Sequence, residues 1–95
     1  MSRKQIYEQQ QQATLKKWQA EIDKLQAKAS EASAGAKLEF RKQIEQLGAK
    51  RAAAESKLEE LRRASEDKWE GMKGGVESAF KDVSDRVKAA ASHFK

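Results

Sequence analysis

The chain has 95 residues, a net charge of +5, and neither cysteine nor proline. A chain of this length accommodates one small domain, and without cysteine it has no disulfide, no thiolate metal site and no cysteine nucleophile. The absence of proline favours long helices, because a proline inside a helix costs about 3 kcal/mol.

The positive charge is spread along the chain rather than clustered. No basic run is longer than two residues, and the excess lies in residues 1–65, where basic side chains alternate with Glu and Gln. A nucleic-acid-binding surface needs clustered charge, so this distribution indicates a solvated helix surface and disfavours nucleic acid as a partner. The polar N-terminus and the lack of a long apolar window predict a cytoplasmic protein.

The first predicted element is a heptad seam over residues 15–36, in which apolar and small residues recur at alternating steps of three and four. Such a seam is typical of a coiled coil. Tyr7 and Trp18 are expected to anchor its N-terminal end. The seam weakens toward residue 36 because alanine buries little surface. Its members are Leu15, Trp18, Ile22, Leu25, Ala29, Ala32 and Ala36.

A second seam follows the same rhythm, but its junction with the first takes two consecutive steps of four, from Ala36 to Phe40 to Ile44. The junction fits an unbroken helix that locally unwinds, or a turn within residues 30–37 with Gly35 as its breaker. We favour one long helix over residues 4–64, because neither a proline nor a paired turn signal interrupts it. The members of this seam are Phe40, Ile44, Leu47, Arg51, Ala54, Leu58 and Leu61.

A clearer boundary is predicted at residues 62–70. Arg62 and Arg63 suit the C-terminal end of a helix, and Ser65 is a good N-cap with Glu66 and Asp67 in the following first turn. The chain is therefore expected to divide into a long helical region, 1–64, and a C-terminal helix within 65–95.

The stretch WEGMKGGVESAF (69–80) raises the question of a glycine-rich ligand loop. The apolar residues from Trp69 to Phe94 fall within an arc of about 80° on a helical wheel, and the three glycines lie on the opposite side. The pattern predicts an amphipathic helix over about 66–93 with glycines on its wet face. A phosphate loop would need a preceding strand and a GxxxxGK[ST] pattern, and the sequence has neither.

No residue pattern indicates a reaction. His93 is the single histidine, the carboxylates are dispersed along helix faces, and the serines have no recognisable base beside them. We therefore predict a protein that is not an enzyme and that uses no cofactor, no metal and no small-molecule substrate.

The segments WQAEIDKLQAKA (18–29), AKLEFRKQIEQL (36–47) and KLEELRRASEDKWEGMKGGVESAF (57–80), with the final HFK, carry a family resemblance. In this order they resemble a family of small coiled-coil stress-response proteins of cyanobacteria and proteobacteria. The most specific run extends from Ala64 to Phe80. Family members often have glycine at the position of Glu66, which weakens the case for a sharp break at 65. They have acidic residues at the positions of Gly35 and Gly71, and this difference strengthens the case for a break at 35. The resemblance implies a helical scaffold linked to stress, and it supplies no catalytic residue or partner.

These observations predict an all-α protein, either an antiparallel helical hairpin or an elongated three-helix bundle, that binds itself or another helical protein. One long helix would leave its alanine-rich part uncovered and so would favour self-association. The alternative function is peripheral membrane binding through residues 69–94. The predicted packing and interaction face comprises Leu15, Trp18, Ile22, Leu25, Phe40, Ile44, Leu47, Leu58, Leu61, Trp69, Met72, Val76, Phe80, Val83, Val87 and Phe94.

Overall fold

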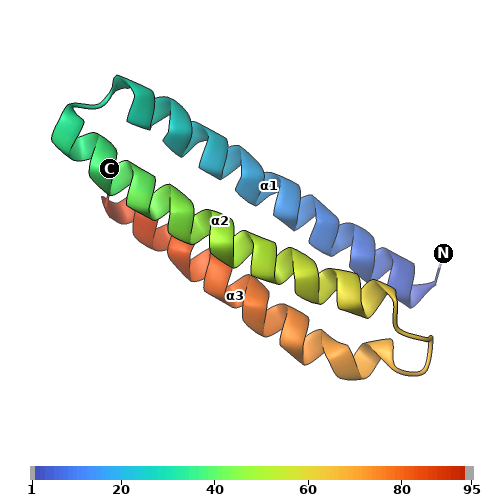
Figure 1. Ribbon diagram of the computed structural model, residues 1–95. Helices are drawn as coiled ribbons and strands as arrows, with labels where there is room; N and C mark the ends of the chain where they lie inside the picture. The colour runs from blue at the N-terminus through green and yellow to red at the C-terminus, as the bar shows by residue number, and fades with distance from the viewer. Residues whose placement is uncertain (1, 94–95) are drawn as a thin grey trace.

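The computed structural model describes residues 2–93, apart from the side chain of His93. Three helices, α1 (Arg3–Glu31), α2 (Ala34–Arg62) and α3 (Trp69–His93), form an elongated antiparallel bundle of 52 × 20 × 19 Å (Figure 1). The prediction of an all-α fold is confirmed, in its three-helix form. α2 is the central helix, because α1 and α3 both lie along it and approach each other least.

The prediction of one long helix over residues 4–64 is wrong. The backbone of Ala32 and Ser33 is extended, and the chain reverses direction between α1 and α2. Reversal allows the two seams to face each other, whereas a continuous helix would leave both uncovered. Burial of these seams outweighs the helix preference of the surrounding alanines.

A turn within residues 30–37 is present, but Gly35 is not the residue that breaks the helix. It lies in the first turn of α2, and within residues 2–93 no glycine adopts a positive φ. The break falls two to three residues earlier, at Ala32 and Ser33. Ser33 occupies the N-cap position of α2, and its carbonyl oxygen accepts a hydrogen bond from the Lys37 N–H at 2.8 Å.

The second boundary lies where the sequence indicates a break, but it is broader than predicted. α2 ends at Arg62 and α3 begins at Trp69, not at residue 65 or 66. The Ser65 carbonyl accepts hydrogen bonds from the N–H groups of Lys68 and Trp69, which makes a turn before the regular helix. The Ser65 hydroxyl donates to the Asp67 carboxylate at 2.6 Å and caps no backbone N–H, so the N-cap prediction for Ser65 is wrong.

Hydrogen bonds within α1 and between α1 and α2 fix the helix ends and the pairing of these two helices. A capping box starts α1: the Ser2 hydroxyl accepts from the Gln5 N–H, and the Gln5 side chain accepts from the Ser2 N–H, both at 3.2 Å. The Lys4 ammonium donates to the Arg62 carbonyl at 2.6 Å and so satisfies an open carbonyl at the end of α2. In the middle of the bundle, the Arg51 guanidinium donates to the Leu15 carbonyl at 3.1 Å.

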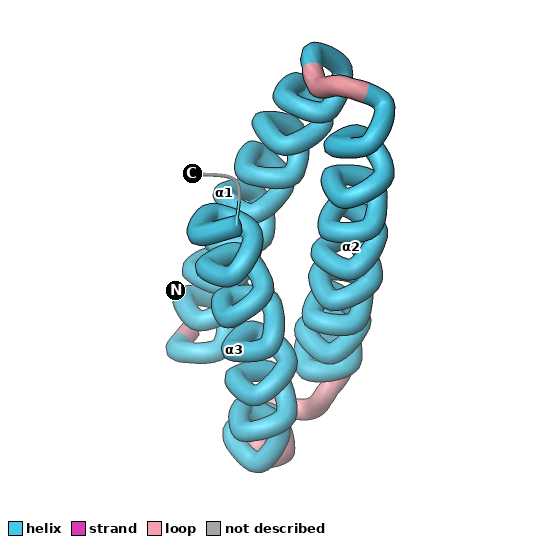
Figure 2. The backbone as a smooth tube through the Cα atoms, turned by 90° about the vertical axis from the view of Figure 1, so that its left-hand side faces the viewer, coloured by secondary structure: helices cyan, strands magenta, loops and turns pink. Residues whose placement is uncertain are grey.

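The core has two parts, which we call the aromatic half and the alanine half. The aromatic half joins the start of α1, the end of α2 and the start of α3, and its buried residues are Tyr7, Leu15, Trp18, Ala54, Leu58, Leu61, Trp69, Val76, Phe80 and Val83. The alanine half lies toward the α1–α2 connection, which extends beyond the described end of α3 (Figure 2). Its buried residues are Ile22, Leu25, Phe40, Leu47 and Ala90, with Ala29, Ala32, Ala36, Ile44 and Val87 packed against them.

Candidate functional site

The space between α1 and α3 is closed in the aromatic half by two aromatic pairs. The rings of Tyr7 and Trp69 lie 5.8 Å apart between centroids, and those of Trp18 and Phe80 lie 5.1 Å apart. Both pairs have a tilted geometry, which is favourable for aromatic rings. Each pair joins α1 to α3 directly, so the two outer helices meet here although each of them also lies along α2.

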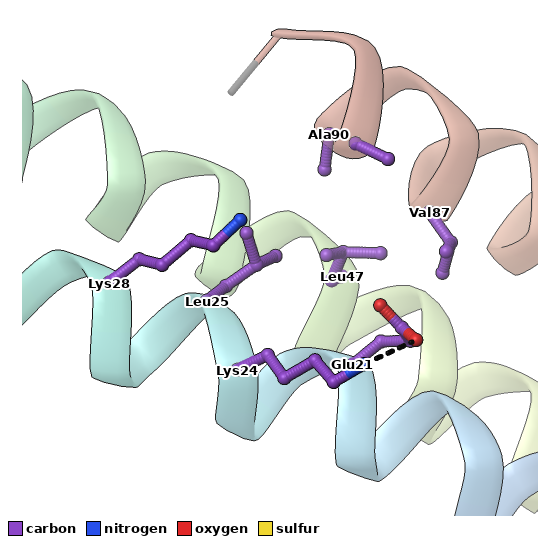
Figure 3. Close-up of a pocket in the computed structure, with 8 residues that line it drawn as sticks. Glu21, Lys24, Leu25, Lys28, Leu47, Val87 and Ala90 are labelled. Carbon is purple, nitrogen blue, oxygen red and sulfur yellow. Dashed lines mark ion pairs between the residues drawn. The ribbon is translucent and has the colours of Figure 1, made fainter. Parts of the chain in front are cut away.

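In the alanine half the same space is open. A groove of about 210 Å³ lies between α1 and α3, with Leu47 of α2 among the residues that line it (Figure 3). The side chains that line it from α1 and α3 are aliphatic or charged. Leu25 lines the groove from α1, and Val87, Ala90 and Ala91 line it from α3.

The rim of this groove on α1 carries charge. Lys24 and Glu21 form an ion pair at 3.7 Å, and Figure 3 shows the Lys24 side chain directed toward Glu21. Lys28 lines the same groove and has no ion pair within the described part of the chain. The groove therefore joins an apolar floor to one cation whose charge no carboxylate offsets. This is the arrangement in the molecule that most resembles a binding site.

A second surface feature surrounds the aromatic pair at the other end. The Lys73 ammonium lies 5.3 Å from the Tyr7 ring centroid and 5.0 Å from that of Trp69, within the range of a cation–π contact. The Tyr7 hydroxyl is buried and has no hydrogen-bond partner. Burial, followed by the negative charge of Glu77, raises the pKa of Tyr7 above its ordinary value. These contacts stabilise the docking of α3 on α1.

Asp67, in the connection between α2 and α3, also has a shifted pKa. A hydrogen bond from the Ser65 hydroxyl, and then one from the backbone, lower the pKa of the exposed Asp67 carboxyl. Within the described residues, no cluster of three or more His, Cys, Asp or Glu side chains could hold a metal ion. Among the described helices, none is long and apolar enough to cross a bilayer.

The residues of the predicted packing and interaction face mostly lie inside the bundle. Ile44, Met72 and Val87 are half-buried, and Phe94 lies outside the described residues. The buried members are Leu15, Trp18, Ile22, Leu25, Phe40, Leu47, Leu58, Leu61, Trp69, Val76, Phe80 and Val83. Because these side chains contact one another, the face is largely occupied within one chain.

Sequence reasoning left three buried residues out of that face: Tyr7, Ala54 and Ala90. Ala54 lies in the second heptad seam, and Ala90 lies on the apolar arc of α3. Both side chains are small, so the sequence gives little sign that they are buried. Tyr7 lies two steps of four before Leu15, so a seam extended through Gln11 would have included it. The groove between α1 and α3 had no sequence signal, because it depends on which side chains of these two helices lie opposite each other.

Comparison of the chain with protein-family models, with curated proteins and with solved structures gives no match. The resemblance to small bacterial stress-response proteins therefore stays a prediction.

Proposed function

We propose that the protein acts by binding, as a non-enzymatic helical interaction protein of a stress response, and that α3 is the helix that it exchanges with a partner. The observation that carries this proposal is the contrast between the two faces of α3. Trp69, Val76 and Phe80 are buried on one face, while Gly71, Gly74 and Gly75 are exposed on the other. The link to stress comes only from the family resemblance.

The three glycines have no steric reason to be glycine. A Cβ atom built at any of them would meet no other heavy atom within 4 Å, and none of them has a positive φ. Relative to alanine, each lowers the stability of a helix by about 1 kcal/mol. The helical form of α3 therefore depends on the burial of its apolar face, and α3 is the element for which docking on another helix would matter most.

Exchange of α3 would expose two complementary surfaces at once. The apolar face of α3 would be free, and Leu15 and Leu58, which lie with it in the aromatic half, would lose its cover. An amphipathic helix of a partner could then occupy the place of α3 by the helix-in-groove mode of recognition. Apolar faces that are buried within one chain would in this way form the contact with a partner helix.

A competition experiment tests this proposal. A fluorescent peptide of residues 65–93 is added to the intact protein, and its incorporation is followed by fluorescence anisotropy. We expect slow incorporation at a temperature below the melting midpoint. Alanine at Gly71, Gly74 and Gly75 of the intact protein should weaken incorporation by about 30- to 150-fold, because the resident helix becomes harder to displace.

Two results decide the matter. A peptide carrying Phe80→Ser and Val83→Ser serves as the matched control and should not enter the bundle, since both side chains are buried in the aromatic half. If the native peptide enters no better than this control, or if the alanine variant exchanges as readily as the native protein, helix exchange is rejected.

A second candidate function is binding of α3 to a membrane surface. It is favoured by the aromatic side chains on the apolar face of α3 and by lysines such as Lys73 and Lys81 beside them. That face is covered by α1 and α2, so lipid binding would also require α3 to leave the bundle. Anionic vesicles should then shift tryptophan emission to shorter wavelength, and alanine at the three glycines should reduce the shift. An unchanged emission spectrum would exclude this function.

A further inference from the structure

We propose that the groove between α1 and α3 binds a free medium-chain fatty acid, with the alkyl chain over Leu47 and the carboxylate paired with Lys28. The proposal requires no release of α3, so it is independent of the function proposed above.

The groove lies where aliphatic side chains line the space between α1 and α3. Where Trp18 meets Phe80 this space is filled, but beside Leu25 the described residues of α3 that line it are Val87, Ala90 and Ala91. Leu47, which lines the groove from α2, is almost fully buried at 1% exposed. Apart from the charged residues on its α1 rim, the groove is lined by aliphatic side chains, and a flexible alkyl chain gains free energy by leaving water for such a surface.

The groove is small, at about 210 Å³. A short alkyl chain such as the tail of octanoate suits a groove of this size. Drug-sized ligands occupy pockets of about 300–1,000 Å³, so a single narrow chain fits this groove better than a compact ring system does.

The charge on the rim selects the head group. Lys24 is already paired with Glu21, but Lys28 has no ion pair within residues 2–93 and lies beside the apolar wall (Figure 3). A carboxylate at the mouth of the groove would gain a charge-assisted hydrogen bond from Lys28. A second copy of the chain is disfavoured as the occupant, because two such grooves face to face would bring the lysines of both copies together.

The test uses the full-length protein and sodium octanoate, well below the concentration at which it forms micelles. Amide signals in two-dimensional NMR should shift at Leu25, Leu47 and Ala91 and saturate at one octanoate per protein. We expect a dissociation constant on the order of 1 mM, as for a small ligand that is only partly enclosed. Octyltrimethylammonium, which has the same tail and the opposite charge, should bind more weakly.

Variants locate the site and separate its two parts. Ala91→Leu fills the groove and should abolish saturable binding, while Ala89→Leu, on another side of α3, should leave it unchanged. Lys28→Gln should weaken octanoate binding about two- to fivefold, the range for an exposed ion pair. Lys17→Gln, an exposed lysine of the same helix outside the groove, is its control. A circular dichroism melt of each variant shows that it folds.

Three outcomes would overturn the proposal. The first is equal binding of the two amphiphiles, which would mean that Lys28 selects nothing. The second is octanoate binding that survives Ala91→Leu in a folded variant. The third is binding to anionic vesicles without binding of free octanoate, which would assign the surface to membranes.

Discussion

The two halves of the bundle are built from the same three helices, yet they close in different ways. In the aromatic half, Tyr7 and Trp18 reach from α1 to Trp69 and Phe80 of α3. In the alanine half, α1 and α3 present shorter side chains to the gap, and a groove of about 210 Å³ remains. Antiparallel pairing with α2 therefore aligns α1 and α3 but does not by itself bring their side chains into contact. Side chains long enough to span the gap are also required.

This difference predicts a gradient of local stability along the bundle. Aromatic pairs contribute about 0.5–1.5 kcal/mol beyond the burial of their surface, whereas Ala29, Ala32 and Ala36 bury little and remain half-exposed. Segments with few buried apolar contacts open at lower free energy than the core does. We therefore expect the alanine half to open first and the aromatic half to open only with global unfolding.

The largest effect should come from truncating the core in each half. Leu58→Ala removes a side chain that is 0% exposed in the aromatic half and should lower the free energy of unfolding by about 2–5 kcal/mol. Leu25→Ala, at the wall of the groove, should cost clearly less, because one side of Leu25 already faces open space. Urea unfolding of both variants measures the difference, and equal losses would mean that the two halves are packed alike.

The next effect separates side-chain burial from helix propensity within the aromatic half. Alanine at Gly71, Gly74 and Gly75 should raise the free energy of unfolding by about 2–3 kcal/mol, since each Cβ meets open space; the share of Gly71 is the smallest, because it lies in the first turn of α3. Thermal melts followed by circular dichroism measure the gain. Gly35→Ala is a single-site control in the alanine half with an expected gain of up to about 1 kcal/mol, reduced by its place in the first turn of α2. A loss of stability in the triple variant would show that the glycines serve a contact in the folded protein.

A matched pair of enlargements compares the two halves directly. Ala54→Leu adds volume at a position that is 0% exposed and should destabilise the bundle by about 1–3 kcal/mol. Ala91→Leu adds the same volume at the groove and should be neutral or stabilising. Midpoints of urea unfolding are sufficient to rank the two variants. If Ala91→Leu destabilises the bundle as much as Ala54→Leu does, the groove has no free space for the added side chain.

The smallest effect concerns the one polar atom buried among the aromatic side chains. The Tyr7 hydroxyl has no hydrogen-bond partner, so Tyr7→Phe should leave the free energy of unfolding unchanged or raise it by about 1 kcal/mol at pH 7. A clear loss of stability at pH 7 would show that the hydroxyl has a partner in solution.

The same variant has a pH signature. Burial, and then the charge of Glu77, raise the pKa of Tyr7, so the folded state holds this proton more tightly than the unfolded state does. The stabilisation that follows is complete below about pH 10 and is lost as the pH rises through the folded value. Above pH 10 the native protein should therefore lose stability relative to Tyr7→Phe, which lacks this ionisable hydroxyl. A gap between them that stays constant with pH would contradict this account.

Much of the fold could be predicted from the sequence, because the heptad seams and the apolar arc of α3 each specify one buried face. The break at Ala32 and Ser33 could not, since alanine and serine there are compatible with helix and only the mutual burial of two seams decides against it. The start of α3 was misplaced because the Ser65 hydroxyl donates to Asp67 instead of capping the helix. The groove could not be predicted, because it depends on which side chains of α1 and α3 stand opposite each other.

The chain-reversed bundle also changes what is expected in solution. One long helix would leave its alanine-rich part uncovered and would therefore favour self-association. In the three-helix form, α1, α2 and α3 cover one another's apolar faces within a single chain. Self-association thus stays a prediction without that support, and the main question becomes how firmly each half of the bundle is closed.

Amide hydrogen exchange, measured residue by residue by NMR, shows whether the two halves of the bundle differ in local stability. We expect the slowest exchange in the aromatic half, around Leu15, Leu58 and Val76, and faster exchange around Leu25 and Ala90. We also expect rapid exchange at residues 33–36, where the chain reverses and the first N–H groups of α2 lie. Uniform protection along all three helices, or protection that continues through residues 32–36 as in one unbroken helix, would contradict this expectation.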